Sequence, residues 1–180
     1  MTWDAVHHRA EVLRRVVDEA DRRRDGVLPL DLPGVTETFD DELALVSALQ
    51  LRWHTRLAGH IERVLMDRPD DLETAVVVGW RETADELAGV RRILDAQRET
   101  PLSPELADAL DTAHRKDAVL MAAMAGLASP SDPSAVRVGE RIESAARAAY
   151  RPTAAPRHLA EGTSRPVGLL DRIRAILPAA

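Results

Sequence analysis

Apolar residues recur every third or fourth position along nearly all of residues 1–150. At the N-terminus this set is Trp3, Val6, Ala10, Leu13, Val17 and Ala20; around residue 55 it is Leu43, Val46, Trp53, Leu57, Ile61 and Val64. This spacing places each set on one face of an α-helix, whereas strands require alternation with a period of two. No segment alternates for a useful length, so the sequence predicts an all-α protein.

Proline and glycine divide this helical pattern. Breaks occur at 26–38, which contains Pro29 and Pro33, and at Pro69, Pro101 and 129–134, because proline lacks a backbone donor and biases the preceding residue away from helix. Residues 26–38 are expected to form an ordered loop with one short turn after Pro33. The remainder predicts a five-helix orthogonal or antiparallel bundle in residues 1–150, with helices at about 3–25, 40–67, 71–99, 103–128 and 134–150.

The last thirty residues have a different character. Residues 151–166 contain three prolines and little apolar bulk, which is typical of a flexible linker. Residues 167–177 predict a short tethered amphipathic helix whose apolar face holds Leu169, Leu170, Ile173, Ile176 and Leu177. We expect that face to dock in a partner groove or fold back on the body; binding to a membrane surface is the third alternative.

Composition excludes several chemistries. The chain has no cysteine, and therefore no disulfide or thiolate site. Its longest strongly apolar run, 118–128, has eleven residues, against about 20 for a membrane span, and the N-terminus lacks the apolar core of a signal peptide. We therefore expect a cytoplasmic protein. The paired Glu-x-x-His motifs of a di-iron bundle are missing and only Asp111-x-x-His114 comes near, so neither a metal nor a cofactor is predicted.

Charge is unevenly distributed. The net charge is −6, and lysine supplies only one of the 24 basic residues, Lys116, which favours a GC-rich coding sequence such as an actinobacterial one. Residues 151–180 carry +3, so residues 1–150 carry −9. An acidic body is a poor nucleic-acid binder, because that affinity depends on neutralising phosphates.

A candidate small-molecule pocket involves two of the three tryptophans. Trp53 and His60 share a helix face with Arg56 between them, and Trp80 lies on the following helix. An apolar cavity with a few polar groups is typical of ligand sites, so Trp53, Arg56, His60 and Trp80 are the predicted pocket for a small apolar ligand, with Glu82 as a further polar candidate. The alternative is that both tryptophans are core residues and His60 is a half-buried neighbour.

Two alanine-rich stretches predict close helix packing. These are Ala118–Ala128 and Ala145–Ala149. Either one monomer covers both, or they form the interface of a homodimer, in which a symmetric contact buries the same patch twice. We expect the homodimer.

The layout resembles a TetR-type regulator. An amphipathic N-terminal helix is followed by Thr38-Phe39-Asp40-Asp41-Glu42-Leu43-Ala44-Leu45, which is similar to that family's junction between DNA-reading head and body, and the later helices resemble the body. The resemblance covers about residues 5–150 and implies a ligand-binding body that dimerises through its last two long helices. The head departs from the family, because the thirteen residues of 26–38 cannot hold a helix-turn-helix and residues 1–40 carry −3, whereas a DNA-reading head is basic.

These observations predict a non-enzymatic helical module that binds a ligand or a protein partner, TetR-like but without a working DNA-reading head. One alternative is a DNA-binding regulator with an unusual head that uses Arg14, Arg15 and 22–24. The other is a helical enzyme whose site is assembled from residues distant in the sequence.

Overall fold

A computed structural model describes residues 3–152, with side chains from Val6 onward, and all the regular secondary structure within that range is helical. The helices are α1 (Trp3–Arg23), α2 (Val35–Thr38), α3 (Glu42–Asp67), α4 (Leu72–Glu86), α5 (Ala88–Glu99), α6 (Pro104–Met124) and α7 (Ala135–Ala149). The predicted all-α class is confirmed. The tail residues Leu169, Leu170, Ile173 and Ile176 lie outside the described residues.

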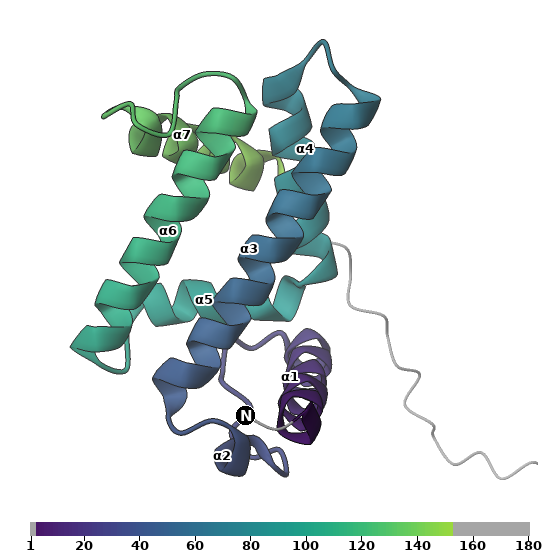
Figure 1. Ribbon diagram of the computed structural model, residues 1–180, viewed down its shortest axis with the longest axis vertical. Coiled ribbons are helices and arrows are strands. Elements are labelled where there is room, and N and C mark those ends of the chain that lie inside the picture. The colour runs from purple at the N-terminus through teal and green to yellow at the C-terminus, as the bar shows by residue number, and fades with distance from the viewer. Residues whose placement is uncertain (1–2, 153–180) are drawn as a thin grey trace, which may run out of the picture.

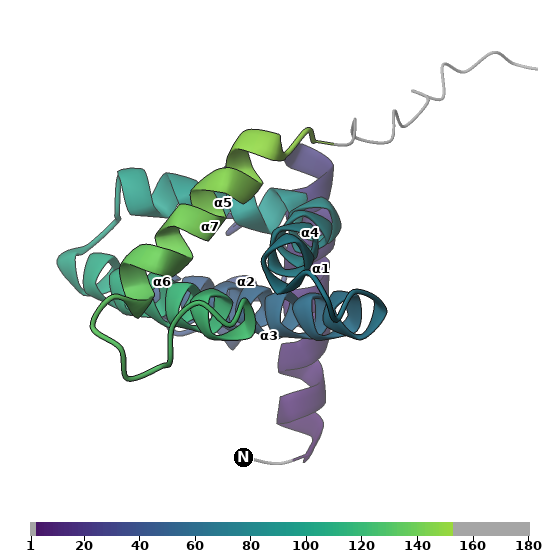
Figure 2. The same ribbon diagram turned by 90° about the horizontal axis from the view of Figure 1, so that it is seen from above.

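The helices pack in crossed layers rather than as one parallel bundle. In Figure 1, α3 and α6 run side by side up the molecule, and α4 returns antiparallel to α3. Figure 2 shows that α5 and α7 cross behind this pair, and that α1, seen nearly end-on in Figure 1, lies roughly perpendicular to α3. Pairs α3–α4, α6–α7 and α1–α5 are all in contact.

The expected single helix over 71–99 is wrong, because the chain bends at Leu87. This residue has φ −120° and ψ 42°, caps α4, and precedes α5. The bend lets α5 cross α1, and Leu87 itself is buried at 1% exposure. With this break and the four-residue α2, which is the short turn expected after Pro33, residues 3–152 hold seven helices rather than five.

Two glycines allow the helices to cross closely. A Cβ on Gly89 would overlap the backbone of Ala20 in α1, and one on Gly139 would overlap the carbonyl of Ala118 in α6. The Gly89 amide also donates to Asp21 Oδ1 at 2.6 Å. Burial raises the pKa of Asp21, and this hydrogen bond opposes the rise. Both glycines lie inside helical patterns, where only the tertiary contact explains them.

The first helix buries only the C-terminal part of the predicted face, where Val17 and Ala20 are buried and Leu13 is half-buried. Val6 is 50% exposed and Ala10 is exposed, while the buried residues are Val12, Val16, Val17 and Ala20. The reason is that α1 crosses α5 with its C-terminal half, so its first turns project beyond the body, as Figure 2 shows. In α3, by contrast, the predicted stripe is buried apart from the half-buried Leu43.

Helix boundaries follow local capping chemistry. Asp41 and Asp71 accept the backbone amides of Ala44 and Thr74, and Ser103 accepts that of Leu106 with proline next in the chain. Such side-chain acceptors satisfy amides that have no partner within the helix. After α1 the chain turns through Gly26, whose φ of +80° is favourable only for glycine.

Among the described residues, none of the helices has the length and hydropathy needed to cross a bilayer.

Candidate functional site

The two tryptophans of the predicted pocket are core residues. Trp53 and Trp80 are 1% and 2% exposed and meet edge-to-face, with ring centroids 5.8 Å apart. Tyr150 continues the row, 5.9 Å from Trp80, and its hydroxyl donates to the Ala84 carbonyl. These rings join α3, α4 and the end of α7.

The two polar residues of the predicted pocket lie at the surface between α3 and α4. His60 Nε2 donates to Glu86 at 2.7 Å while its Nδ1 accepts from Arg63 at 2.8 Å. Arg56 is half exposed and pairs with Glu86 at 2.9 Å, and Glu82 pairs with Arg63. The structure therefore does not bring Trp53, Trp80, Arg56 and His60 together around one cavity.

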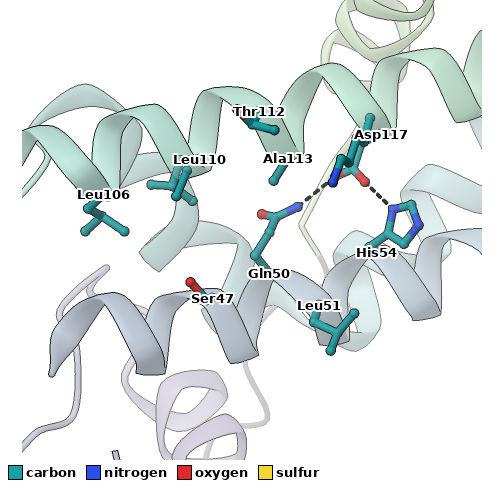
Figure 3. A pocket seen from close by; sticks show the side chains of 11 residues that line it. Ser47, Gln50, Leu51, His54, Leu106, Leu110, Thr112, Ala113 and Asp117 are labelled. Atoms are coloured by element: carbon teal, nitrogen blue, oxygen red, sulfur yellow. Dashed lines mark hydrogen bonds and ion pairs between the residues drawn. The ribbon is translucent and has the colours of Figure 1, made fainter. Parts of the chain in front are cut away.

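A groove lies elsewhere, between α3 and α6, and its volume is about 320 Å³. Its floor is apolar, formed by the buried Leu106 and Leu110 and the half-buried Ala109 and Ala113. Leu51 on the α3 side is 65% exposed. Figure 3 shows Leu106, Leu110 and Ala113 along α6, opposite Gln50 of α3.

A buried carboxyl group closes one end of this groove. Asp117, 5% exposed, lies 2.5 Å from His54 Nδ1 through Oδ1 and accepts from Gln50 Nε2 at 2.9 Å through Oδ2. Figure 3 shows both partners reaching from α3 toward α6. Burial raises the pKa of Asp117, and the hydrogen bonds from His54 and Gln50 oppose that rise.

The rest of the lining adds a few polar groups to an apolar surface. Ser47 and Thr112 contribute hydroxyls and the exposed Lys116 an amine. The amide nitrogen of Gln50 donates to Asp117, and its amide oxygen points toward the Leu110 side of the groove, as Figure 3 shows. An apolar floor with a few directed polar groups, at a volume near 300 Å³, is the usual make-up of a small-molecule site.

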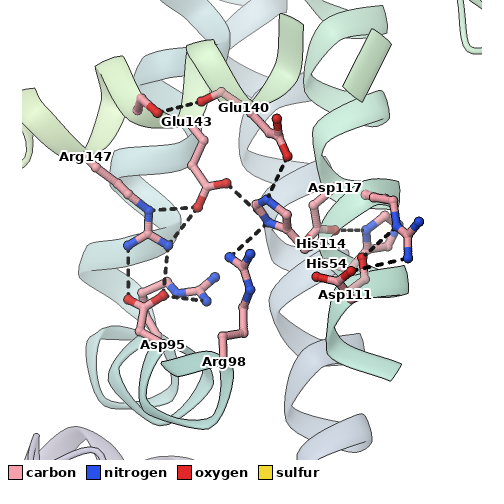
Figure 4. A network of polar contacts seen from close by, with 12 residues as sticks. His54, Asp95, Arg98, Asp111, His114, Asp117, Glu140, Glu143 and Arg147 are labelled. Carbon is pink, nitrogen blue, oxygen red and sulfur yellow. Dashed lines mark hydrogen bonds and ion pairs between the residues drawn. The ribbon is translucent and has the colours of Figure 1, made fainter. Parts of the chain in front are cut away.

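Behind the groove, a network of charges joins α5, α6 and α7 (Figure 4). Arg147 forms a bidentate contact with Asp95 at 2.9 and 3.0 Å and a second contact with Glu143. Arg91 also reaches Asp95, at 2.9 Å. His114 lies 3.4 Å from Glu143. A larger hollow of about 470 Å³ lies over these groups, but three of its carboxylates, Asp95, Glu140 and Glu143, already pair with arginine or histidine.

Two arginines of this network, the buried Arg91 and the half-buried Arg147, also cover the tryptophans. The guanidinium of Arg91 lies 4.6 Å from the Trp53 ring centre, and that of Arg147 lies 5.1 Å from the Trp80 ring centre. Cations over aromatic faces are attracted by the ring quadrupole. Trp53 and Trp80 therefore pack in the core against guanidinium groups of the charge network.

The alanine-rich stretches are partly covered within one chain. Ala118 and Ala122 are buried in α6, and Gly139 of α7 packs on Ala118. Ala145 and Ala149 are exposed on α7. The homodimer through Ala118–Ala128 and Ala145–Ala149 stays a prediction.

The arginines of the DNA-binding alternative are partly engaged by carboxylates. Arg22 and Arg23 pair with Glu19, and Arg23 also pairs with Asp31. These contacts hold the pKa of Glu19 at about 2. Between α1 and α3 the structure holds only the four-residue α2, which leaves no second helix for a helix-turn-helix.

The sequence did not predict the α3–α6 groove, although two polar residues of α3 could have indicated it. Gln50 and His54 are polar residues one turn apart on a helix that is otherwise largely apolar around them. Nothing in the sequence pairs them with Asp117, which is 63 positions from His54. Among the described residues, no group of three or more histidines and carboxylates is arranged to hold a metal ion.

Comparisons with protein-family profiles, curated sequences and solved structures found no match to this chain. The function is therefore argued from the geometry of the groove.

Proposed function

We propose that this protein is a non-enzymatic small-molecule binding protein and that the α3–α6 groove is its binding site. The observation that carries the proposal is an open apolar groove ending at a buried, hydrogen-bonded carboxyl group. Burying a carboxyl group is costly unless hydrogen bonds compensate for the lost water. The hydrogen bonds to Asp117 come from Gln50 and His54, which also line the groove. The TetR-type resemblance also implies ligand binding by the body. The proposed site is the α3–α6 groove, however, and differs from the pocket predicted around Trp53 and Trp80.

The groove favours a small, mostly apolar ligand with one polar end. Leu106, Leu110 and Ala113 cover its apolar part. The polar end meets the Gln50 carbonyl oxygen and a hydroxyl at Ser47, which accept or donate a hydrogen bond. A volume of about 320 Å³ lies at the lower limit for ligand sites, so the ligand is smaller than a typical drug molecule.

The test is to fill the groove. Ala113→Trp places an indole on the floor, and Ala109→Trp does so one turn away. Ala10→Trp, at an exposed position of α1 outside the groove, is the matched control. Native mass spectrometry of chain purified gently from its own host is expected to show retained small-molecule mass in wild type and control only. In vitro, anilinonaphthalene sulfonate is expected to bind the filled variants at least tenfold more weakly.

Equal retained mass and equal probe affinity in all four proteins would remove the groove from the function. Circular dichroism of each variant separates loss of binding from loss of fold.

One observation favours a helical enzyme as the second candidate. Asp117 orients the His54 ring through its Nδ1 atom. The His54 side chain is 40% exposed, which leaves Nε2 on the side open to solvent. A carboxylate-oriented histidine is the usual arrangement of a general base. Hydrolysis of p-nitrophenyl acetate is expected to fall in His54→Asn if this candidate holds, and an unchanged rate rejects it for this ester class.

A further inference from the structure

A small cationic hollow lies where the ends of α1 and α7 meet the bend between α4 and α5. Its volume is about 230 Å³. Among the described residues that line it, four are arginines and one is a carboxylate, namely Arg24, Arg91, Arg92, Arg147 and Asp95. We call this hollow the arginine pocket. Residues 1–150 carry −9, so its lining is opposite in sign to the body as a whole.

The carboxylate of this lining is shared by two guanidinium groups. Asp95 Oδ1 lies 2.9 Å from a nitrogen of Arg91 and 2.9 Å from a nitrogen of Arg147; Figure 4 shows the contact with Arg147. Glu143, which pairs with Arg147 from outside the pocket, is the second carboxylate. These two carboxylates balance the two guanidinium groups, and Arg92 adds exposed positive charge beside them.

Arg91 is the buried member of the set, at 9% exposure. Its Nε has no hydrogen-bond partner among the described residues. Burial lowers the pKa of this guanidinium, and the charge of Asp95 opposes that fall. A cation taken out of water is costly unless counter-charges and hydrogen bonds compensate. Because the compensation at Arg91 is incomplete, an anion in the pocket would add to it.

The backbone at Arg24 is a second sign that a cation is needed here. Arg24 follows α1 in the left-handed region, at φ +50°, where glycine is the usual residue at a helix end. Its Nε donates to the Asp21 carbonyl at 3.1 Å, and its side chain lines the pocket. A long cationic side chain thus occupies a position whose backbone disfavours it, which is typical of a functional site.

The lining favours a phosphate group among the possible anions. The planar guanidinium matches both carboxylate and phosphate oxygens, but a phosphate monoester carries about −1.5 to −2 near neutral pH and so neutralises several cations better. The apolar part of the lining is short and includes Ala84, Ala88 and Trp80. A volume of about 230 Å³ is below the range of drug-sized ligands, which leaves room for a phosphate group and few carbon atoms.

We propose that the arginine pocket binds a phosphate group, either as free phosphate or carried on a small molecule. Arg91, held by Asp95, forms the buried part of the site, and Arg92 forms its exposed rim. The pocket shares no lining residue with the α3–α6 groove. Phosphate binding here is therefore independent of the proposed function.

Titration of the full chain with inorganic phosphate, followed by amide NMR at constant pH and ionic strength, tests the site. We expect saturable shifts for amide signals of 88–95 and 147–150, and none for 47–54 in the groove. Arg92→Gln is expected to weaken phosphate binding about tenfold, the effect of losing one charge-assisted hydrogen bond. Arg141→Gln, which removes the same charge from an exposed position of α7 outside the pocket, is expected to keep wild-type affinity.

Two further probes identify the chemistry of the ligand. Glycerol 3-phosphate that binds more tightly than inorganic phosphate assigns the site to a carried phosphate, and equal or weaker binding assigns it to the free anion. Acetate at the same ionic strength is expected to bind more weakly than either.

Three results overturn the proposal: no saturable shift at these amides with millimolar phosphate, equal affinity in Arg92→Gln and wild type, or acetate that binds as tightly as phosphate. Circular dichroism of both arginine variants checks that they fold. Ala113→Trp, which fills the groove, is expected to leave phosphate binding unchanged, so failure of either site can be told from failure of the other.

Discussion

Asp117 places a carboxyl group where little water can solvate it. Its two oxygens are met by His54 and Gln50 from α3, and the cationic Arg91 also acts on it electrostatically. Burial outweighs these favourable contacts, since the pKa of Asp117 is raised. A residue in this position lowers stability when ionised and is expected to be kept for a reason other than stability.

The pH dependence of stability tests whether burial of Asp117 outweighs its hydrogen bonds. Because the folded pKa of Asp117 lies above its ordinary value of 3.8, the folded state binds this proton more tightly, so the group's contribution to stability is lost as pH rises above about 3.8. Asp117→Asn removes this dependence. We expect the unfolding free energy of the variant relative to wild type to increase from pH 3.5 to pH 6, by about 1.4 kcal/mol per unit of pKa shift.

Thermal and urea unfolding at several pH values measure the effect. Asp108→Asn is the control, since Asp108 is exposed on the same helix and is expected to follow the wild-type profile. A constant difference between Asp117→Asn and wild type across this range would contradict the assignment.

At the scale of elements, two glycine contacts determine how the helices cross. Gly89 of α5 lies against Ala20 of α1, and Gly139 of α7 against Ala118 of α6. In both cases the neighbour is backbone, which cannot rotate away as a side chain can. The crossed layers of Figures 1 and 2 follow from these contacts.

Adding one methyl group at either crossing is expected to cost stability. Overpacking typically costs about 1–3 kcal/mol, and we expect Gly89→Ala and Gly139→Ala to reach or exceed about 3 kcal/mol because backbone must move. Gly59→Ala in α3 is the matched control: nothing lies within 4 Å of its added Cβ. That variant is expected to gain about 0.5–1 kcal/mol from helix propensity.

Urea unfolding of the three variants decides the matter. Equal small effects at all three glycines would show that the helix crossings tolerate an extra carbon and are set by other contacts.

At the scale of the whole molecule, the charge distribution argues against DNA. The net charge is −6, and Arg22 and Arg23 are neutralised by Glu19 and Asp31. Phosphate neutralisation supplies most non-specific affinity. We expect no gel shift with DNA from around its own gene at micromolar protein and moderate salt. A shift that is lost in Arg14→Ala with Arg15→Ala would restore the DNA-binding alternative.

The expected homodimer is a second prediction at this scale. Ala145 and Ala149 are exposed on α7, where small side chains let a second helix approach closely. Native mass spectrometry is expected to show a dimer that Ala149→Arg converts to monomer. Thr55→Arg, at an exposed position of α3, is expected to leave it intact, and a wild-type monomer at all concentrations would reject the interface.

The sequence by itself determined the helical class, most helix ends and the buried stripe of α3. These depend on local physics: the spacing of apolar residues, proline breaks, and caps such as Asp71 and Ser103. The bend at Leu87 was missed because α5 turns there to cross α1, a contact that no local pattern encodes. On α1 the burial of Val17 and Ala20 was predicted correctly, but that of Val6 and Ala10 was not, because no local pattern encodes where this helix leaves the body.

The site depended on the tertiary structure almost entirely. Trp53 and Trp80 suggested a pocket in the sequence, yet packing puts them in the core beneath Arg91 and Arg147. His54 and Asp117 lie far apart in the chain, and only the pairing of α3 with α6 brings them within 2.5 Å. A groove forms only between helices that pack side by side. Long-range packing decides which helices do so, and no local pattern in the sequence encodes it.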